Sequence, residues 1–559
     1  MKKSWQQHYP KGVPLEIPPI KEQTLAELFD GSCKLYQDKI AFSSMGSNIS
    51  FKDLSILVNR FALYLQYELN LEPGTKIAIM LPNLLQYPIV MFAALKAGLT
   101  IVNINPMEKA DALQHELSDS GAQAIIVLEN FAAELSKAVK ETQLKHIITT
   151  NVGDCLGFPQ KHIVNFVLRY IKNSIPKHGL KKTLKLDEIL FKYENNKELK
   201  IAHNDLAFIQ YTSGTTSKAK GVMLSHKNIL ANIYQAKAWL NDYISDEDEI
   251  IITALPLYHI FSLTANCWVY FTIGANNILI PNPRDMNSFV KQLKGYKFTA
   301  ITGVNTLFHG LINNSSFHKL DFSALKITLG GGMAVSESVA LKWHSITGCH
   351  ITQAYGLTET SPAATINLVG TKFNGSIGFP IPSTDICIKD DNGKVLAENE
   401  QGEICIKGPQ VTSGYWHNTE ATKSTIKDNW LHTGDIGYMD KDGLIYIVDR
   451  LKDLIVVSGF NVTAIEVENC LIELSAIAEA AVVALNNEHQ GESIAAHIVL
   501  QNGKHITKQE IINHCHAKIA AYKVPHHIYV HNELPKNNLG KILKRKLREL
   551  QQNNTLGEL

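Results

Sequence analysis

The feature that most constrains the fold of this chain is the alternation of helix-like and strand-like segments over its first four hundred residues. NLLQYPIVMFAALKAG predicts a helix that ends at Gly98, and the TIVNI that follows it predicts a short strand. LSHKNILANIYQAKAWL predicts another helix, with Ser225 as its N-cap and with Ile229 and Ile233 on its apolar face. Helices that alternate with short apolar strands favour packed α/β layers.

Two turn signals mark a change of pattern in the next part of the chain. Asn392-Gly393 lies within ICIKDDNGKVLAE, and Asp442-Gly443 lies within DIGYMDKDGLIYIVDR. Both dipeptides favour tight hairpin turns and are flanked by strand-like residues. We therefore expect a β-rich subdomain at about residues 370–450.

The length of the chain indicates more than one folding unit. A single hydrophobic core stops growing well below 559 residues, so at least two units are expected. A short charged link follows Arg450, and the rest of the chain mixes helix and strand signals. We predict an α/β multidomain protein, with a large N-terminal domain (1–451) of layered α/β subdomains plus the β-rich subdomain, and a small α+β C-terminal domain (452–559).

Composition narrows the classes of protein further. The net charge is +1, from 54 Lys+Arg against 53 Asp+Glu, so we expect no nucleic-acid partner. The eight cysteines are scattered, with no CxxC and no zinc-type spacing to histidine, which indicates reduced thiols in the cytoplasm. The N-terminal MKKSWQQHYPKG has no apolar stretch behind it and does not resemble a secretory signal.

The segment 250–280 lacks Asp, Glu, Lys and Arg, which makes it a candidate for a membrane span. Pro256, Asn266, Gly274 and Asn277 interrupt it, and no run of about 18 apolar residues survives. We predict a buried core segment.

A loop rich in hydroxyl groups is the strongest local motif. In AFIQYTSGTTSKAKGVMLSH, the strand-like residues 206–211 lead into a segment of small hydroxyl residues, glycine and lysine. Such a loop offers donors, close backbone approach and positive charge to a phosphate. It is not a Walker A loop, and the alternative is a surface loop that binds nothing. The phosphate-binding candidates are Tyr211, Thr212, Ser213, Gly214, Thr215, Thr216 and Lys220.

Five further motifs follow the loop in order. They are TLGGGMAV (328–335), QAYGLTETSP (353–362), WLHTGDIGYMDKDG (430–443), VDRLKDLIVVSGFNV (448–462) and LPKNNLGKILKRKL (534–547). Together with the loop, these motifs resemble those of the adenylate-forming superfamily. PNLLQYP, TALPLYHIF, NPRD, FTAITGVNTLF and IKGPQV resemble the bacterial long-chain fatty-acid–CoA ligases within it.

The resemblance implies a two-step ligase. A fatty acid would react with ATP to give acyl-AMP and pyrophosphate, and CoA would then take the acyl group and release AMP. The expected ligands are the fatty acid, ATP, CoA and Mg²⁺. By this resemblance Glu359 holds Mg²⁺, together with Thr215, and Thr358 contacts the α-phosphate. From position alone, the commoner interpretation of Glu359 is a capping carboxylate at a helix start.

The same resemblance assigns the transition-state and nucleotide contacts. Lys541 would bridge the carboxylate and the α-phosphate, whereas we expect Lys544, Arg545, Lys546 and Arg548 to be a solvated basic face. Asp435 would accept the ribose hydroxyls, with Arg450 beside it. Tyr355 would stack on adenine. The remaining purine contacts would come from Gly330, Gly331, Gly332 and Gly356.

The resemblance also implies that the C-terminal domain is mobile and serves both steps. Lys452 matches the hinge position, and Ser458, Gly459 and Phe460 match the loop that lines the pantetheine tunnel. His259 resembles a residue near the acyl and thioester sites, although alone it is read as a core histidine. Thr463 and Glu466 form a capping-box pattern that makes Ala464 the first residue of a helix.

The stretch FVLRYIKNSIPKHGLKKTLK (166–185) mixes apolar and basic residues. It is suited to the inner leaflet of a membrane, and the alternative is a solvated surface segment. Peripheral contact with the inner leaflet is therefore one possibility for this chain, and a homodimer is another. Other open functions are a ligase for medium-chain or aryl acids, an acyl-AMP ligase that feeds a carrier protein, and an inactive nucleotide-binding protein.

Overall fold

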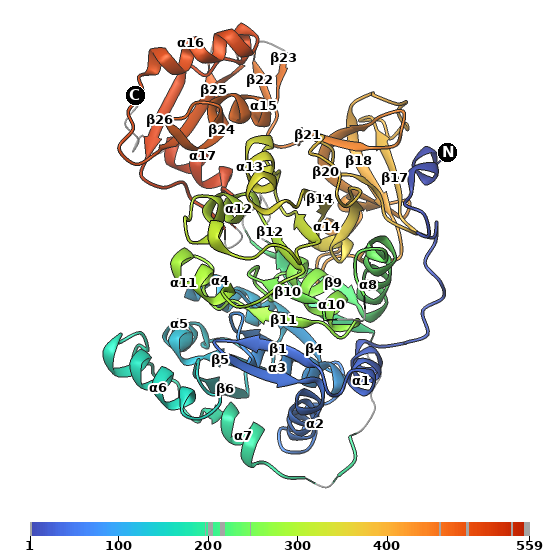
Figure 1. Ribbon diagram of the computed structural model, residues 1–559, viewed down its shortest axis with the longest axis vertical. Helices are drawn as coiled ribbons and strands as arrows, with labels where there is room; N and C mark the ends of the chain where they lie inside the picture. Colours follow the sequence, from blue (N-terminus) through green and yellow to red (C-terminus); the bar gives the residue numbers. More distant parts are fainter. Residues whose placement is uncertain are drawn as a thin grey trace.

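The computed structural model confirms an α/β protein with several sheets and a smaller C-terminal unit, drawn in red in Figure 1. It describes residues 3–195, 197–199, 205–212, 218–245, 248–457, 460–487, 491–537 and 540–552. The boundary between residues 451 and 452 stays a prediction.

The first large sheet has the order β16-β15-β14-β13-β12-β10-β11-β1-β2 and is parallel from β14 to β1. Its strands are β1 (Ile40–Ser44), β2 (Ser47–Ser50), β10 (Ile250–Thr253), β11 (Asn276–Leu279), β12 (Ala300–Gly303), β13 (Ile327–Gly330), β14 (Ile351–Gly356), β15 (Ala363–Ile366) and β16 (Phe379–Pro380). Parallel strands need crossover connections, which explains the intervening helices.

The second large sheet has the order β7-β6-β5-β3-β4-β8-β9, with only the β8–β9 pair antiparallel among its described strands. Its strands are β3 (Lys76–Met80), β4 (Thr100–Asn103), β5 (Ala124–Leu128), β6 (His146–Thr150), β7 (Leu184–Lys185), β8 (Leu206–Thr212) and β9 (Lys220–Ser225). Alternate residues of β3 face different cores: Ile77 and Ile79 lie in the main core, and Met80 lies under α4 (Ala110–Ser120) and α5 (Ala132–Ala138).

Two smaller sheets complete the molecule. The β-rich subdomain holds β17 (Asp385–Lys389), β18 (Gly402–Lys407), β19 (Ile426–Lys427), β20 (Trp430–Met439) and β21 (Ile445–Arg450). The C-terminal sheet holds β22 (Ile455–Val457), β23 (Phe460–Val462), β24 (Ile477–Asn487), β25 (Gly491–Leu500) and β26 (His527–His531). Asp442-Gly443 joins β20 to β21 as predicted, whereas the Asn392-Gly393 turn returns only through the isolated Lys389–Val395 bridge.

The longer helices cover the sheets and the core between them. They include α1 (Leu25–Leu35), α2 (Phe51–Tyr67), α3 (Gln86–Lys96), α7 (Leu186–Lys192), α8 (His226–Leu240), α11 (Met286–Leu293), α12 (Asn305–Ile312), α13 (Glu337–Thr347) and α14 (Thr419–Thr425). In the C-terminal unit, α15 (Ala464–Ile472) and α16 (Lys508–Lys518) cover one face of the sheet, and α17 (Lys544–Gln552) covers the other. The predicted helix ending before Gly98 and the Ser225 N-cap are confirmed.

The uncharged segment 250–280 is buried, as predicted. It forms β10, α9 (Ile260–Ser262), η4 (Leu263–Trp268), α10 (Val269–Phe271) and β11. Phe271 lies at the centre of an aromatic cluster, with its ring centroid 4.6 Å from that of Phe51, 4.9 Å from that of Phe92 and 5.6 Å from that of Phe29. No helix in the described part of the chain is both long enough and apolar enough to cross a membrane.

We expect Phe271→Ala to lower the free energy of unfolding of the main core by about 3–5 kcal/mol, because it removes a large buried ring and leaves a cavity. Urea denaturation followed by tryptophan fluorescence measures the change. The matched control is Phe166→Ala, because Phe166 is 57% exposed, and its effect should stay within about 0.5 kcal/mol. Similar effects of the two substitutions would contradict this account of the core.

Candidate active site

The candidate site lies at the carboxyl ends of the parallel strands in both large sheets. β13 ends at Gly330, β14 ends at Gly356, and β8 ends at Thr212, so three of the sequence motifs meet there. Ligands of open α/β sheets bind at this edge, because the loops that leave the strands converge on it.

Asp435 is the fixed carboxylate of the site. It faces Arg450 across the β20–β21 hairpin, and the Arg450 Nε lies 3.0 Å from Asp435 Oδ1. The Tyr355 hydroxyl, from β14, donates a hydrogen bond of 2.6 Å to Asp435 Oδ2. Burial and the Asp435 charge raise the pKa of Tyr355 well above its usual value, so the phenol stays a donor. Three predicted nucleotide contacts are therefore brought together.

Lys541 comes from the C-terminal unit, yet it lies near enough to this group for the charges of Arg450 and Asp435 to act on its ammonium group. Burial, with a further contribution from the nearby Arg450 charge, lowers the pKa of Lys541 to about 8. Its loop is closed by two hydrogen bonds: the Lys541 N–H donates to Asn537 Oδ1 at 2.9 Å, and the Asn537 N–H donates to the Lys541 carbonyl at 2.8 Å. Gly540 has φ +80°, and a Cβ there would lie 2.6 Å from Thr306 Oγ1 on α12. The loop that carries Lys541 is thus packed against α12 of the N-terminal part of the protein.

Glu359 lies in η6 (Thr358–Thr360), which directly follows β14. The Tyr415 hydroxyl donates a hydrogen bond of 2.7 Å to Glu359 Oε1. Burial, followed by the Glu359 charge, raises the pKa of Tyr415, so this donor also stays protonated. The Lys220 Nζ lies 5.5 Å from the centre of the Tyr415 ring. Tyr415 therefore connects the carboxylate to the base of the hydroxyl loop.

The base of the hydroxyl loop is the β8–β9 hairpin. Thr212 and Lys220 face each other at its end, and the chain at Tyr415 runs beside it through a bridge to Val222. The predicted residues Ser213, Gly214, Thr215 and Thr216 lie outside the described part of the chain. The Tyr211 phenol donates to Asp119 Oδ2 at 2.6 Å, so this side chain has a structural partner.

The triple glycine and His259 lie close together. A Cβ on Gly331 would lie 3.0 Å from the Ala354 carbonyl and 3.2 Å from the Phe261 ring, so a side chain at this position would press on both β14 and α9. Gly332 follows with φ +75°. His259 Nδ1 accepts the Phe261 N–H at 3.3 Å, and burial lowers the pKa of His259 to about 4. The imidazole is therefore neutral at physiological pH.

The basic C-terminal helix corrects one prediction. Lys544 is not solvated: its Nζ lies 2.8 Å from Glu468 Oε1, and its side chain is 17% exposed. Arg548 Nη2 lies 2.6 Å from Asp453 Oδ1, next to the predicted hinge residue Lys452. Only the outward face of α17, which carries Arg545 and Lys546, is exposed as expected. A one-dimensional pattern of basic residues does not show which of them meet buried carboxylates.

The predicted capping box at Thr463 is also wrong. α15 does begin at Ala464, but the Thr463 side chain accepts no hydrogen bond from the backbone of the helix. Instead, the Ala464 N–H donates to Asp449 Oδ2 at 2.5 Å. Burial raises the pKa of Asp449. Asp449 and Tyr415 were missed because their roles depend on partners far away in sequence. Among the remaining predicted residues, Ser458 and Gly459 lie outside the described part, and Phe460 begins β23.

Comparison with known proteins agrees with this geometry. The family model of AMP-binding enzymes matches residues 29–416, and that of the AMP-binding enzyme C-terminal domain matches residues 466–541. Long-chain-fatty-acid–CoA ligases of Yersinia pestis and Haemophilus influenzae are 45% and 46% identical, over 98% of both chains in each case. The crystal structure of an anthranilate–CoA ligase in complex with anthranoyl-AMP superposes with a TM-score of 0.84, covering 97% of this chain and 98% of that one, at 23% identity.

The pKa of Lys541 predicts a pH dependence. The ammonium form predominates below about pH 8, so we expect kcat/KM for pyrophosphate release to fall as the pH rises through about 8. Lys541→Arg should lower the rate but remove this fall, because guanidinium stays charged. Pyrophosphate release measured from pH 6 to 10 checks both profiles. An unchanged fall in the arginine variant would assign the titration to another group.

Proposed function

This chain belongs to the AMP-binding enzyme family, within the long-chain-fatty-acid–CoA ligases, and we propose the residues with which it performs the two steps of that reaction. In the first step a long-chain fatty acid attacks ATP to give acyl-AMP and pyrophosphate. In the second step the CoA thiol displaces AMP and forms the acyl thioester. The observation that carries the proposal is the half-buried Lys541, whose ammonium group lies within the electrostatic reach of the Asp435–Arg450 ion pair.

The first step brings two anions together. Two like charges 4 Å apart repel by about 4 kcal/mol at an effective dielectric of 20. Lys541 would lie between the acyl carboxylate and the α-phosphate, where its burial strengthens each attraction. Thr358 would donate to the α-phosphate, and the loop from Thr212 to Lys220 would hold the phosphates that leave.

Asp435 and Tyr355 would hold the nucleoside. Asp435 offers two acceptor oxygens to the ribose hydroxyls, and the ion pair with Arg450 orients that carboxylate. The Tyr355 ring would stack on adenine, opposite the close-packed backbone at Gly331. Because Tyr355 and Asp435 are hydrogen bonded, the base and ribose contacts are held in one geometry.

Glu359 fits a magnesium ion. Mg²⁺ prefers carboxylate and phosphate oxygens, and Glu359 lies at the end of the hairpin from which the hydroxyl loop leaves. Tyr415 fixes the carboxylate through Oε1. With Thr215 as a second oxygen donor, Glu359 would hold the ion, which neutralises phosphate charge when bound.

The second step would use the hinge at Lys452. In the present arrangement the charges of Arg450 and Asp435 act on Lys541, which supports a role for this lysine in the first step. Rotation about Lys452 would withdraw Lys541 and bring residues 458–460 over the acyl-AMP. His259, neutral and near Gly331, would then lie close to the thioester. Arg548 holds α17 to Asp453, so α17 would turn with the hinge.

The direct test is pyrophosphate release from the purified protein with ATP, Mg²⁺ and a panel of free acids, with and without CoA. We expect the highest release with long-chain acids, and acyl-CoA only when CoA is present. Lys541→Ala should reduce release by at least a hundredfold while ATP binding persists, because the lysine acts mainly in the transition state. Release that is highest with aryl acids, or acyl-AMP that never reaches CoA, would contradict the proposal.

We further propose that residues 157–185 dock on an anionic membrane surface, from which the fatty acid is collected. α6 (Gln160–Phe166) and η3 (Val167–Ile171) lie at the edge of the molecule remote from the C-terminal unit (Figure 1). Apolar side chains are exposed along residues 157–185, and the most exposed are Phe158 at 87%, Tyr170 at 66% and Ile171 at 66%. Lysines exposed in the same stretch are Lys172, Lys177, Lys181 and Lys182. Each basic residue near an anionic leaflet contributes about 1 kcal/mol.

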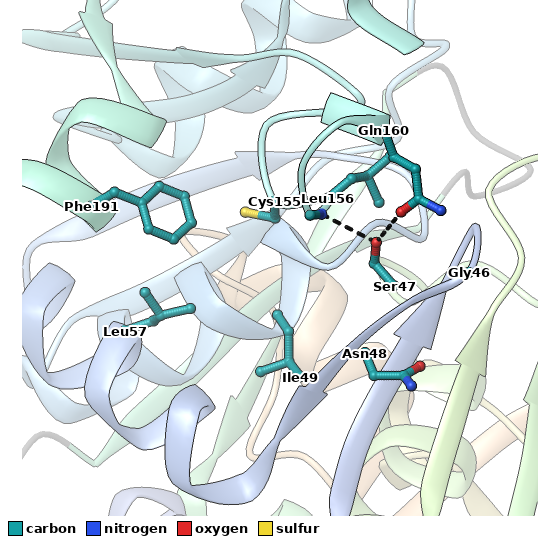
Figure 2. A pocket seen from close by; sticks show the side chains of 10 residues that line it. Gly46, Ser47, Asn48, Ile49, Leu57, Cys155, Leu156, Gln160 and Phe191 are labelled. Carbon is teal, nitrogen blue, oxygen red and sulfur yellow. Dashed lines mark hydrogen bonds between the residues drawn. The ribbon is translucent and has the colours of Figure 1, made fainter. Parts of the chain in front are cut away.

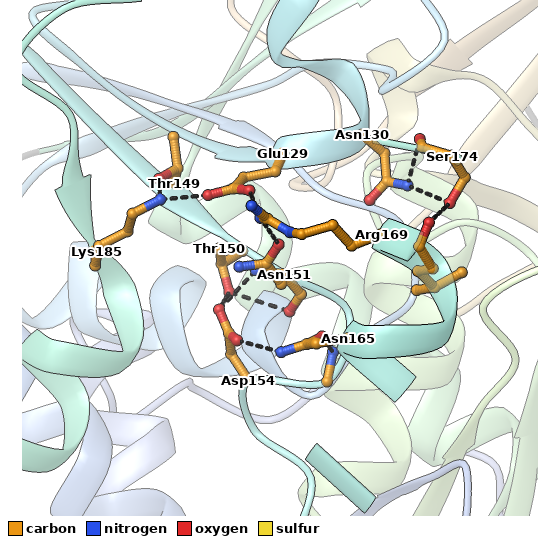
Figure 3. A network of polar contacts seen from close by, with 12 residues as sticks. Glu129, Asn130, Thr149, Thr150, Asn151, Asp154, Asn165, Arg169, Ser174 and Lys185 are labelled. Atoms are coloured by element: carbon orange, nitrogen blue, oxygen red, sulfur yellow. Dashed lines mark hydrogen bonds and ion pairs between the residues drawn. The ribbon is translucent and has the colours of Figure 1, made fainter. Parts of the chain in front are cut away.

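The docking segment is held firmly to the second sheet. Figure 3 shows the buried Glu129, which forms one ion pair with Arg169, at 2.5 Å, and another with Lys185. Asn165 donates to Asp154 Oδ1 at 2.9 Å from the same side of α6. Because these polar contacts bind one face of the segment to the protein, the exposed apolar residues lie on the other face.

A recess lies at the base of this segment. An open cavity of about 460 Å³ is lined by Ile49, Leu57, Leu156 and Phe191, with Ser47 at its rim (Figure 2). Ser47 Oγ donates to Gln160 Oε1 at 3.0 Å and joins the β1–β2 turn to α6. The recess also has Asn48 and Gln160 in its lining, so its wall is partly apolar and partly polar.

Sedimentation with vesicles tests the docking surface. Phe166→Asp/Ile171→Asp should weaken binding to phosphatidylglycerol-containing vesicles at least tenfold, because two apolar side chains are lost and negative charge is added. Activity on a water-soluble medium-chain acid should not change. Leu35→Asp, a control at a residue 69% exposed on α1, should bind like the wild type. Equal vesicle binding by the wild type, the double variant and the Leu35→Asp control would refute the docking surface.

A further inference from the structure

A second cluster of ligand-type side chains lies on the β-rich subdomain, away from Glu359. Cys387, Cys405 and His432 occupy directly opposed positions on the adjacent strands β17, β18 and β20. Opposed residues of an antiparallel sheet project from the same face, as do residues two apart on one strand. Glu403, two residues before Cys405, therefore joins the same face.

The side-chain atoms are already at near-ligand separations. Cys405 Sγ lies 3.5 Å from His432 Nδ1, and His432 Nδ1 lies 2.6 Å from Glu403 Oε2. The donor atoms of Glu403, Cys405 and His432 all lie within 4.8 Å of one another. Cys405 is buried, whereas the side chains of His432 and Glu403 are 13% and 23% exposed, which leaves a path from solvent.

These distances suit a small soft cation. Zinc bonds are about 2.0–2.3 Å long, so tetrahedral ligand atoms lie about 3.2–3.8 Å apart. The Cys405–His432 distance already falls in that range, and the Glu403–His432 distance must open by about 0.6 Å. We propose that Glu403, Cys405 and His432 form a site for a soft divalent cation such as Zn²⁺, with water as the fourth ligand.

Charge and ligand type both support this choice of cation. A thiolate and a carboxylate neutralise a divalent ion, so the bound site would carry no net charge. On binding, the Cys405 thiol and any Nδ1–H of His432 release their protons to solvent, and the ion takes their place. Sulfur and imidazole ligands favour Zn²⁺ over Mg²⁺, so this site is chemically distinct from that of Glu359.

The site is coupled to the nucleotide contacts through Glu403. Its other oxygen, Oε1, accepts the Gly434 N–H at 2.9 Å, and Gly434 has φ +71° directly before Asp435. An ion on Oε2 would leave this second hydrogen bond in place. Occupancy therefore fixes the turn that presents Asp435, and we expect it to raise the melting temperature.

Cobalt substitution tests the site. Metal-free protein titrated with Co²⁺, in the presence of Mg²⁺, should bind one equivalent with thiolate-to-cobalt charge-transfer absorption, and Zn²⁺ should displace it. Cys405→Ser should abolish this absorption, and Glu403→Gln should weaken binding at least tenfold. The matched control is Cys470→Ser/Cys515→Ser. It removes two thiols of the C-terminal unit whose sulfurs lie 3.9 Å apart, and it leaves the proposed site intact. The control should keep the absorption.

Folding of the variants is checked by their melting temperatures without metal. Zn²⁺ should raise the melting temperature of the wild type and of the control, but not that of Cys405→Ser. Three results would overturn the proposal: no Co²⁺ absorption in the wild type, absorption that persists in Cys405→Ser, or absorption that is lost in the control.

Discussion

The arrangement of the active site depends on the ion pair between Asp435 and Arg450. The two residues face each other across the β20–β21 hairpin, and the chain leaves for the C-terminal unit directly after Arg450. The pair therefore lies both at the proposed ribose contact and at the start of the C-terminal unit. Tyr355 adds the end of β14 to the same group through Asp435. One carboxylate thus connects the first large sheet with the β-rich subdomain, close to the proposed hinge.

The C-terminal unit contributes to the site through a single loop. The loop that carries Lys541 packs closely on α12 because Gly540 fits against Thr306, where a side chain would collide. The following helix, α17, is held by the Lys544–Glu468 and Arg548–Asp453 ion pairs. These pairs lie within the C-terminal unit, so they position the lysine loop without tying the unit to the N-terminal sheets. Such an arrangement is compatible with the rotation that we propose about Lys452.

Much of the fold follows from local patterns. The helices at residues 86–96 and 226–240, the Asp442-Gly443 hairpin and the buried segment 250–280 were all predicted, because each depends on neighbouring residues. The errors share a cause. The capping of α15 by Asp449 and the pairing of Lys544 with Glu468 join residues distant in sequence. The cluster of Glu403, Cys405 and His432 escaped a search for metal-type spacing for the same reason.

The sequence by itself determined the family, the α/β class and the motifs that supply each chemical group. Order and spacing along the chain are enough for these, since hydrophobic periodicity and turn residues act locally. Only the tertiary structure decided that Tyr415 holds Glu359, that the charges of Arg450 and Asp435 act on Lys541, and that α6 keeps its apolar side outward. Burial and partnership depend on which strands become neighbours in a sheet, and that is a property of the whole packed chain.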